Sequence, residues 1–169
     1  AGIPAGVFDV LHINNTDAAQ IIADPRVHAI TLTGSERAGK SVASNAGNNL
    51  KKCVMELGGS DTFEKLDDAD LVKAIPIAIA SRFGNGGQTC IAAKRFILTP
   101  GIATEFVSRF VEAASKLLVG DPNLDETNLA PMVRPDAREE LHRQVLASVA
   151  AGAKLIIGGQ KGPGVCDYP

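Results

Sequence analysis

Short apolar runs rich in β-branched residues alternate with helix-like segments through the first 57 residues of the chain. These runs are typical of strands and span residues 7–13, 27–33 and 50–57. Helices are expected between them, from residue 18 to the residue before Pro25 and from the capping Ser35 to about Ala46, where Gly47 ends the helix. This order favours parallel strands joined by helical crossovers, so we expect an α/β fold.

The second part of the chain, from about residue 61, alternates in the same way. Strands are expected at 62–66, 94–99 and 154–157, and helices from the acidic segment 67–70 to about 83, at 102–118 and at 135–151. Negative charge at 67–70 suits a helix N-terminus better than a metal site. Pro76 should kink or split the first helix. Glu64 and Lys65 are charged within a strand, which indicates an edge position or a perturbed strand.

The overall composition excludes several classes of protein. Hydrophobic residues make up 45% of the 169 residues and charged residues 21%, which is normal for a globular protein with a core. The formal net charge of −2 leaves no basic excess to neutralise phosphates, so no nucleic-acid partner is expected. No apolar run approaches about 18 residues, so no membrane-spanning helix is expected.

The cysteine pattern favours a reduced, cytoplasmic protein without a metal site. There are three cysteines, Cys53, Cys90 and Cys166, and no C-x-x-C pair, while the three histidines are scattered. Cys53 alternates with Met55 and Leu57 along an expected strand, so we expect it to pack in the core.

Cys90 follows a turn rich in glycine and amide side chains, Asn85-Gly86-Gly87-Gln88-Thr89. These polar flanks are unlike those of a Cys that acts as a small hydrophobe in a buried strand, which is the alternative interpretation. A thiolate is a strong nucleophile, and an oxyanion formed on it could accept a hydrogen bond from the N–H of Cys90 itself. Cys90 is therefore the candidate nucleophile.

Two further turns carry candidate site residues. Glu56 ends an apolar strand just before Gly58 and Gly59, and it is either a general base or a surface carboxylate. Gly34 and Ser35 stand between a strand and a helix, where free N–H groups and the helix dipole favour a phosphate. A plain Ser N-cap is the alternative there, since the turn is not the G-x-G-x-x-G fingerprint.

Together these motifs resemble the aldehyde dehydrogenase superfamily, and the resemblance covers nearly the whole chain. It runs from Ala1-Gly2-Ile3-Pro4 to the turns Gly120-Asp121-Pro122 and Ala130-Pro131-Met132, and the run 49–61 is most similar to the succinate-semialdehyde branch. The resemblance implies an aldehyde-dehydrogenase-like α/β fold in two parts. Residues 1–57 would be the C-terminal part of a Rossmann-type NAD(P)-binding domain, and residues 58–169 the N-terminal part of the catalytic domain.

The resemblance also implies roles for the candidate residues. Cys90 would attack an aldehyde, and Glu56 would activate the water that hydrolyses the resulting thioester. Gly34 and Ser35 would contact the pyrophosphate of NAD or NADP, with the backbone of Leu57 nearby. The substrate would be a small-molecule aldehyde such as succinate semialdehyde, and the parent enzyme would be a homo-oligomer.

Two alternatives remain open at this point. An acylating dehydrogenase would pass the acyl group to coenzyme A, but Glu56 argues against it because water activation would then be unnecessary. A non-catalytic structural or interaction protein could use the same fold. Members of the superfamily are several times longer, so we expect the chain to be an internal piece that is inactive and binds NAD(P) poorly by itself.

Overall fold

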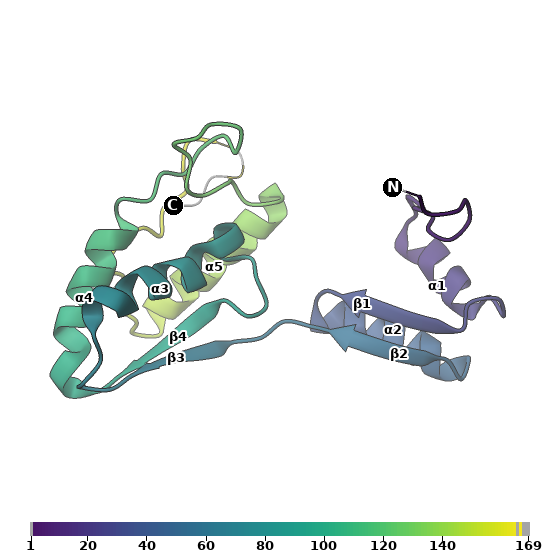
Figure 1. Ribbon diagram of the computed structural model, residues 1–169, viewed down its shortest axis with the longest axis horizontal. Helices are drawn as coiled ribbons and strands as arrows, with labels where there is room; N and C mark the ends of the chain where they lie inside the picture. Colours follow the sequence, from purple (N-terminus) through teal and green to yellow (C-terminus); the bar gives the residue numbers. More distant parts are fainter. Residues whose placement is uncertain (1, 165, 167–169) are drawn as a thin grey trace. The chain divides into compact units, whose positions relative to one another are not determined.

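The computed structural model of the protein describes residues 2–164 and 166. The chain folds into two compact units, Ala1–Gly58 and Gly59–Pro169 (Figure 1). Each unit contains a two-stranded parallel sheet with helices packed against it, which confirms the α/β class. None of the described helices is long and apolar enough to cross a membrane.

The first unit alternates helices and strands along the chain. Its elements are α1 (Asn15–Ala23), β1 (Ala29–Thr33), α2 (Glu36–Asn48) and β2 (Lys52–Glu56). β1 and β2 pair in parallel, with Ile30 beside Cys53 and Thr33 beside Glu56. Because parallel strands end at the same edge of a sheet, the residues that follow Thr33 and Glu56 come together there.

Side chains cap the N-termini of both helices of this unit. The Asn14 carboxamide oxygen accepts hydrogen bonds from the N–H groups of Thr16 and Asp17 at 2.8 and 3.0 Å. Ser35 Oγ accepts one from the N–H of Ala38 at 3.2 Å, which confirms Ser35 as an N-cap. Each cap satisfies N–H groups that have no partner within the helix.

The end of α2 differs from the expected one. Gly47 lies inside the helix, which continues to Asn48, and the turn closes at Leu50 with φ of 53°. The N–H of Leu50 bonds to the Gly47 carbonyl at 3.0 Å, and that of Lys51 to the Ala46 carbonyl at 2.9 Å. This is the Schellman pattern, in which the left-handed position is usually a glycine.

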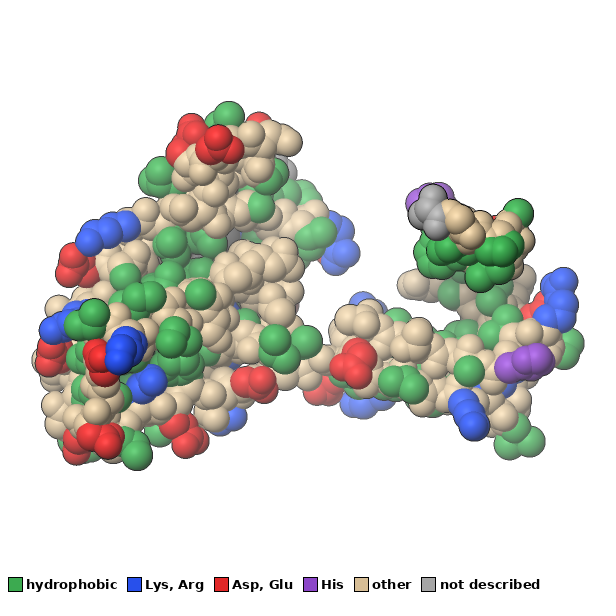
Figure 2. Space-filling view, viewed as in Figure 1, with side chains coloured by type: hydrophobic (Ala, Val, Ile, Leu, Met, Phe, Trp, Pro, Cys, Tyr) green, Lys and Arg blue, Asp and Glu red, His purple; other side chains and the backbone are tan. Residues whose placement is uncertain are grey.

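The expected strand at residues 7–13 does not form. The segment has no regular secondary structure, and Val7, Phe8 and Leu11 are 68%, 76% and 65% exposed. Figure 2 shows hydrophobic side chains gathered on the surface of the segment that precedes α1. A strand needs a hydrogen-bonded neighbour, and among the described residues this segment pairs with none.

Cys53 is exposed, so its expected place in a core was wrong. The hydrophobic side chains buried in the described part of this unit are Ile22 of α1 and Ala46 of α2. The core therefore lies between the helices and does not extend as far as Cys53, although this residue has the strand alternation of an inward-facing position.

The second unit contains the longer helices. Its elements are β3 (Asp61–Lys65), α3 (Leu71–Phe83), the 3₁₀ turn η1 (Gly84–Gly87), β4 (Ala93–Leu98), α4 (Pro100–Ala114) and α5 (Pro135–Ala150). β3 and β4 pair in parallel, with a register shift between Asp61 and Thr62. Figure 1 shows these two strands running side by side next to α3.

Three expectations for this unit need correction. α3 is not split, because it continues through Pro76 as one helix. α4 ends at Ala114 and not at Leu118, because the Asn128 side chain accepts the Leu118 N–H at 2.9 Å and holds that residue in a loop. Residues 154–157 are not a strand; they line a cavity of about 360 Å³ beside β4 and α4 without a described partner strand.

Glu64 and Lys65 lie in β3, which pairs with β4 alone among the described residues. Glu64 is exposed, and Lys65 Nζ lies 4.9 Å from the centre of the Phe63 ring. Both charged groups therefore avoid the desolvation that a central strand would impose on them.

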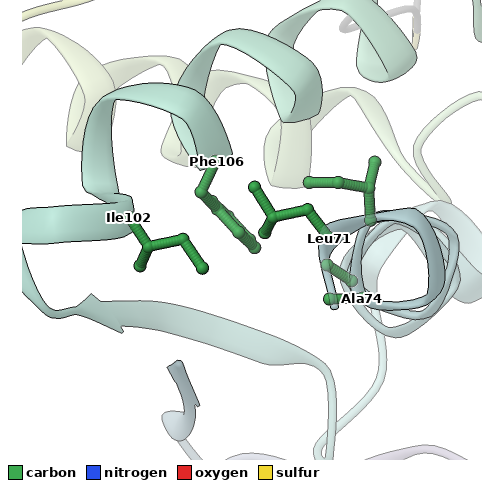
Figure 3. Close-up of a cluster of buried hydrophobic side chains, with 6 residues drawn as sticks. Leu71, Ala74, Ile102 and Phe106 are labelled. Carbon is green, nitrogen blue, oxygen red and sulfur yellow. The ribbon is translucent and has the colours of Figure 1, made fainter. Parts of the chain in front are cut away.

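The core of the second unit lies between α3 and α4 (Figure 3). Its buried side chains are Leu71, Ala74, Ile75, Ala78, Ile102 and Phe106. Phe96 of β4 joins the helices to the sheet, since its ring packs against Phe106 and Phe110 with centroids 5.8 and 5.0 Å apart. Phe83, the last residue of α3, also stacks on Phe110, with centroids 6.1 Å apart. These contacts hold both the end of α3 and β4 against α4, and the turn that carries Cys90 connects α3 to β4.

Candidate functional site

One group of candidate residues, in the first unit, lies where β1 passes into α2. The N–H of Gly34 donates a 2.9 Å hydrogen bond to the carbonyl of Glu56, which extends the parallel pairing by one residue beyond the strands. This bond places the turn that contains Ser35 directly beside the end of β2. The structure therefore brings Gly34, Ser35, Glu56 and Leu57 together at one edge of the first unit.

The start of α2 offers free backbone donors. Ser35 Oγ is occupied by the N–H of Ala38, while the N–H groups of Glu36 and Arg37 donate to no other described residue. First-turn N–H groups of a helix lack intrahelical acceptors and carry the positive end of the helix dipole. Their position after a parallel strand suits a phosphate group.

Leu57 holds α2 against the end of β2. A Cβ atom at Gly39 would lie 2.7 Å from Leu57 Cδ2, so the helix backbone lies directly on the Leu57 side chain. Gly39 is buried and Leu57 half-buried. The close packing of helix on strand at this point keeps the helix N-terminus at the edge of the sheet.

Glu56 is the last residue of β2 and is exposed. Its carboxylate forms no hydrogen bond or ion pair with any other described residue. A carboxylate in this condition keeps all its acceptor sites for a water molecule or a substrate.

A separate group of candidate residues, in the second unit, lies in the turn between α3 and β4. Three consecutive residues, Asn85, Gly86 and Gly87, have positive φ values of 53°, 61° and 73°. The hydroxyl of Thr89 donates to the Gly84 carbonyl at 3.3 Å and closes the turn. Glycine is favoured in this segment because successive residues take the left-handed backbone conformation, which glycine adopts without steric cost.

Arg82, in the last turn of α3, lies against this turn. A Cβ at Gly87 would lie 3.1 Å from both the carbonyl oxygen and Nη2 of Arg82. Arg82 Nη1 is buried without a hydrogen-bond partner among the described residues, and burial lowers the pKa of the guanidinium. Gly87 thus combines a left-handed conformation with a close approach to α3.

Cys90 lies at the exposed end of the turn. Ala92 and Ala93 beside it are 2% and 3% exposed, and the N–H of Ala93 bonds to Ser81 Oγ at 3.3 Å. On the other side, a Cβ at Gly59 would lie 3.1 Å from the Cys90 carbonyl oxygen, so a larger residue at position 59 would require the turn to shift slightly. The Cys90 side chain is therefore accessible to solvent while the backbone beside it is anchored.

Sequence reasoning missed Lys94, the second residue of β4. Its ammonium donates to the carbonyls of Thr89, Cys90 and Ala92 at 2.9, 2.8 and 3.4 Å. No sequence pattern indicated a role for Lys94, because a lysine in a strand is normally expected to face solvent. Lys94 lies four residues after Cys90, but this spacing would predict a contact only if the conformation of the turn were already known.

A comparison with protein families decides the affiliation of the chain. Residues 1–167 match the model of the aldehyde dehydrogenase family. The chain belongs to the aldehyde dehydrogenase family. The α/β fold described above is thus part of the aldehyde dehydrogenase fold.

Two similar curated proteins are named as succinate-semialdehyde dehydrogenases. The chain is 52% identical to the succinate semialdehyde dehydrogenase [NAD(P)+] Sad of Escherichia coli over 168 residues, which are 99% of the chain and 36% of that protein. It is 48% identical to a probable succinate-semialdehyde dehydrogenase [NADP(+)] of Synechocystis, covering 95% of the chain and 35% of the relative. The chain thus spans about a third of the length of these relatives.

Solved structures agree with this affiliation. Succinic semialdehyde dehydrogenase from Streptococcus pyogenes, in complex with NADP+, superposes with a TM-score of 0.89 at 38% identity, covering 94% of this chain and 35% of that one. Succinate-semialdehyde dehydrogenase from Burkholderia pseudomallei gives a TM-score of 0.93 at 31% identity, with coverage of 99% and 35%.

Proposed function

We propose that the full-length protein is an NAD(P)-dependent dehydrogenase that oxidises succinate semialdehyde, or a closely similar aldehyde, to the carboxylic acid. The relatives named for this activity match nearly the whole chain, which supports the substrate class. The observation that carries the mechanism is the exposed Cys90 thiol at the end of an anchored turn. The N–H of Cys90 donates to no other described residue and remains available to an oxyanion.

Cys90 acts as the nucleophile in this proposal. Its thiolate adds to the aldehyde carbon, and the carbonyl oxygen becomes an oxyanion that accepts a hydrogen bond from the Cys90 N–H. Oxidation then leaves a thioester on the sulfur. The NAD(P)+ cofactor supplies the chemistry for that oxidation, since it accepts hydride from the substrate carbon.

Glu56 acts as the general base in the second half of the reaction. Its carboxylate takes a proton from water, and the resulting hydroxide adds to the thioester carbon and expels the Cys90 thiolate. The free state of the Glu56 carboxylate among the described residues supports this role. The presence of Glu56 argues against the acylating alternative, because coenzyme A would replace water there and no base would be needed to activate water.

The first unit offers one feature that suits the phosphates of a dinucleotide. The N-terminus of α2, with Gly34 and Ser35, would hold the pyrophosphate of NAD or NADP through free N–H groups, and Leu57 would hold the helix at this place. We accordingly assign residues 1–57 to the cofactor domain and residues 58–169 to the catalytic domain. In this proposal the enzyme is a cytoplasmic homo-oligomer.

A burst experiment with the full-length protein tests the proposal. Mixing enzyme, NADP+ or NAD+ and succinate semialdehyde should give reduced cofactor, and Glu56→Gln should keep a burst of about one equivalent followed by slow turnover. Mass spectrometry of the quenched variant should find the acyl group on Cys90. Loss of the burst together with turnover in Glu56→Gln would contradict the role of Glu56, and a wild type without any aldehyde-dependent reduction would contradict the activity.

A further inference from the structure

Lys94 makes an unusual set of contacts next to Cys90. Its ammonium has three N–H donors, and the described structure directs them to three carbonyls of the Cys90 turn, those of Thr89, Cys90 and Ala92. No carboxylate of the described chain lies within ion-pair distance of Lys94. The two shorter contacts, 2.9 and 2.8 Å, are charge-assisted hydrogen bonds, and the third at 3.4 Å is weak.

The direction of these carbonyls determines the direction of the neighbouring N–H groups. Peptide units are planar, and the described chain has no cis peptide bond, so the C=O and N–H of one unit point in opposite directions. The Thr89 carbonyl shares its peptide unit with the N–H of Cys90, and the Cys90 carbonyl shares its unit with the N–H of Ile91. Because both carbonyls point toward Lys94, both N–H groups point away from it.

Lys94 is not redundant with the rest of the turn. The Thr89 carbonyl also accepts the N–H of Ala92 at 3.1 Å, but the Cys90 carbonyl has Lys94 as its only donor among the described residues. Gly59 lies against that same carbonyl oxygen and brings no donor of its own to it. Without Lys94, the Cys90 carbonyl would have no donor among the described residues and the Thr89 carbonyl would keep only the N–H of Ala92, so the two peptide units on either side of Cys90 would be held less firmly.

We propose that Lys94 is a positioning residue for the nucleophile: it holds the Thr89 and Cys90 carbonyls on one side of the turn so that the Cys90 N–H stays on the other side as the oxyanion donor. This inference rests on the proposed dehydrogenase function. The ammonium also polarises the Thr89–Cys90 unit, which strengthens its N–H as a donor. The role is exerted through the backbone, and Lys94 itself touches no reacting atom.

The test compares Lys94→Met with a matched control, Lys116→Met, in the full-length protein. Lys116 is an exposed lysine of the same unit that bonds to Glu112 and to nothing in the Cys90 turn. Lys94→Met should lower the rate of the reduced-cofactor burst by about 10- to 100-fold, the range expected when an oxyanion donor is weakened. Lys94→Arg, which restores a cation with several donors, should recover part of that loss, and Lys116→Met should match wild type.

Alkylation of Cys90 by iodoacetamide separates positioning from thiol activation. This substitution forms no oxyanion, so its rate across pH should change by less than about threefold in Lys94→Met. The melting temperature and the cofactor Kd should equal those of Lys116→Met. Equal burst rates in the two variants, an alkylation rate that falls in parallel with the burst, or a fall of melting temperature that accounts for the loss would each overturn the proposal.

Amide hydrogen exchange makes the test independent of activity. In Lys94→Met, peptides covering residues 88–93 should exchange about tenfold faster than in Lys116→Met, because the N–H of Ala92 bonds to a carbonyl that Lys94 also holds. Unchanged exchange would overturn the positioning role even if the wild type proved not to oxidise aldehydes. A wild type without a burst would refute only the proposed function, so the two failures are distinguishable.

Discussion

Gly39 in α2 and Leu57 after β2 approach so closely that a Cβ on Gly39 would lie 2.7 Å from Leu57 Cδ2 and 3.4 Å from its Cγ. The Leu57 side chain would have to move as a whole, because its Cγ and both its methyl groups face position 39. This contact links the helix that offers donors to a phosphate with the strand that ends in Glu56.

Gly39→Ala and Gly47→Ala should therefore change stability in opposite directions. Alanine gains up to about 1 kcal/mol over glycine within a helix, and at Gly47 the added Cβ meets nothing within 4 Å. At Gly39 overpacking against Leu57 costs about 1–3 kcal/mol and outweighs that gain. Urea unfolding of the two variants measures the difference, and adding Leu57→Ala to Gly39→Ala should remove the overpacking. Equal stability of the two single variants would contradict the close packing.

Leu50→Gly should stabilise the protein by about 1 kcal/mol. Leu50 has a φ of 53° and is 97% exposed, so it carries the steric cost of the left-handed conformation and loses no buried contact when it is replaced. Leu50→Ala keeps the Cβ and should change stability little. The midpoint of urea unfolding compares the two, and a stabilisation shared by both variants would show that the left-handed conformation is not the cause.

Gly87→Ala should damage the turn before Cys90, whereas Gly84→Ala should not. Gly87 has a φ of 73°, and a Cβ added there would lie 3.1 Å from the Arg82 carbonyl oxygen. A Cβ added at Gly84 would have no described atom within 4 Å. The left-handed strain alone costs about 1–2 kcal/mol. Gly87→Ala should lower kcat more than it changes the cofactor Kd, because the turn proposed to bind phosphate belongs to the other unit. Full activity of Gly87→Ala would argue against an anchored turn.

Cys90→Ser and Cys53→Ser give a matched pair of thiol replacements at exposed positions. Cys90→Ser should lower kcat by at least about a thousandfold, because a serine hydroxyl is a much weaker nucleophile than a thiolate, and cofactor binding should remain nearly intact. Cys53→Ser should leave kcat close to that of wild type. Steady-state kinetics and cofactor titration measure both, and a Cys90→Ser enzyme with most of its activity would refute the assignment.

The sequence alone determined the features that depend on neighbouring residues. The N-cap at Ser35 was predicted correctly, and Asp70 caps α3 by accepting the N–H of Val72, in agreement with the acidic segment expected there. The helices 36–48, 71–83 and 135–150 formed close to their predicted bounds for the same reason, since helix hydrogen bonds stay within the segment. The glycine turn before Cys90 was likewise evident in the residues that precede it.

Only the tertiary structure decided the features that need a distant partner. Residues 7–13 and 154–157 have strand-like composition, yet a strand exists only where another strand pairs with it, and among the described residues neither has one. The partners of Lys94 lie only two to five residues before it in the sequence, but its contacts depend on the backbone conformation of the turn. That conformation is held by more distant residues, since Ser81 bonds to the N–H of Ala93 and Gly59 lies against the Cys90 carbonyl. Local hydrogen bonding is encoded in adjacent residues, whereas pairing, burial and the direction of peptide units arise from packing between segments that are apart in sequence.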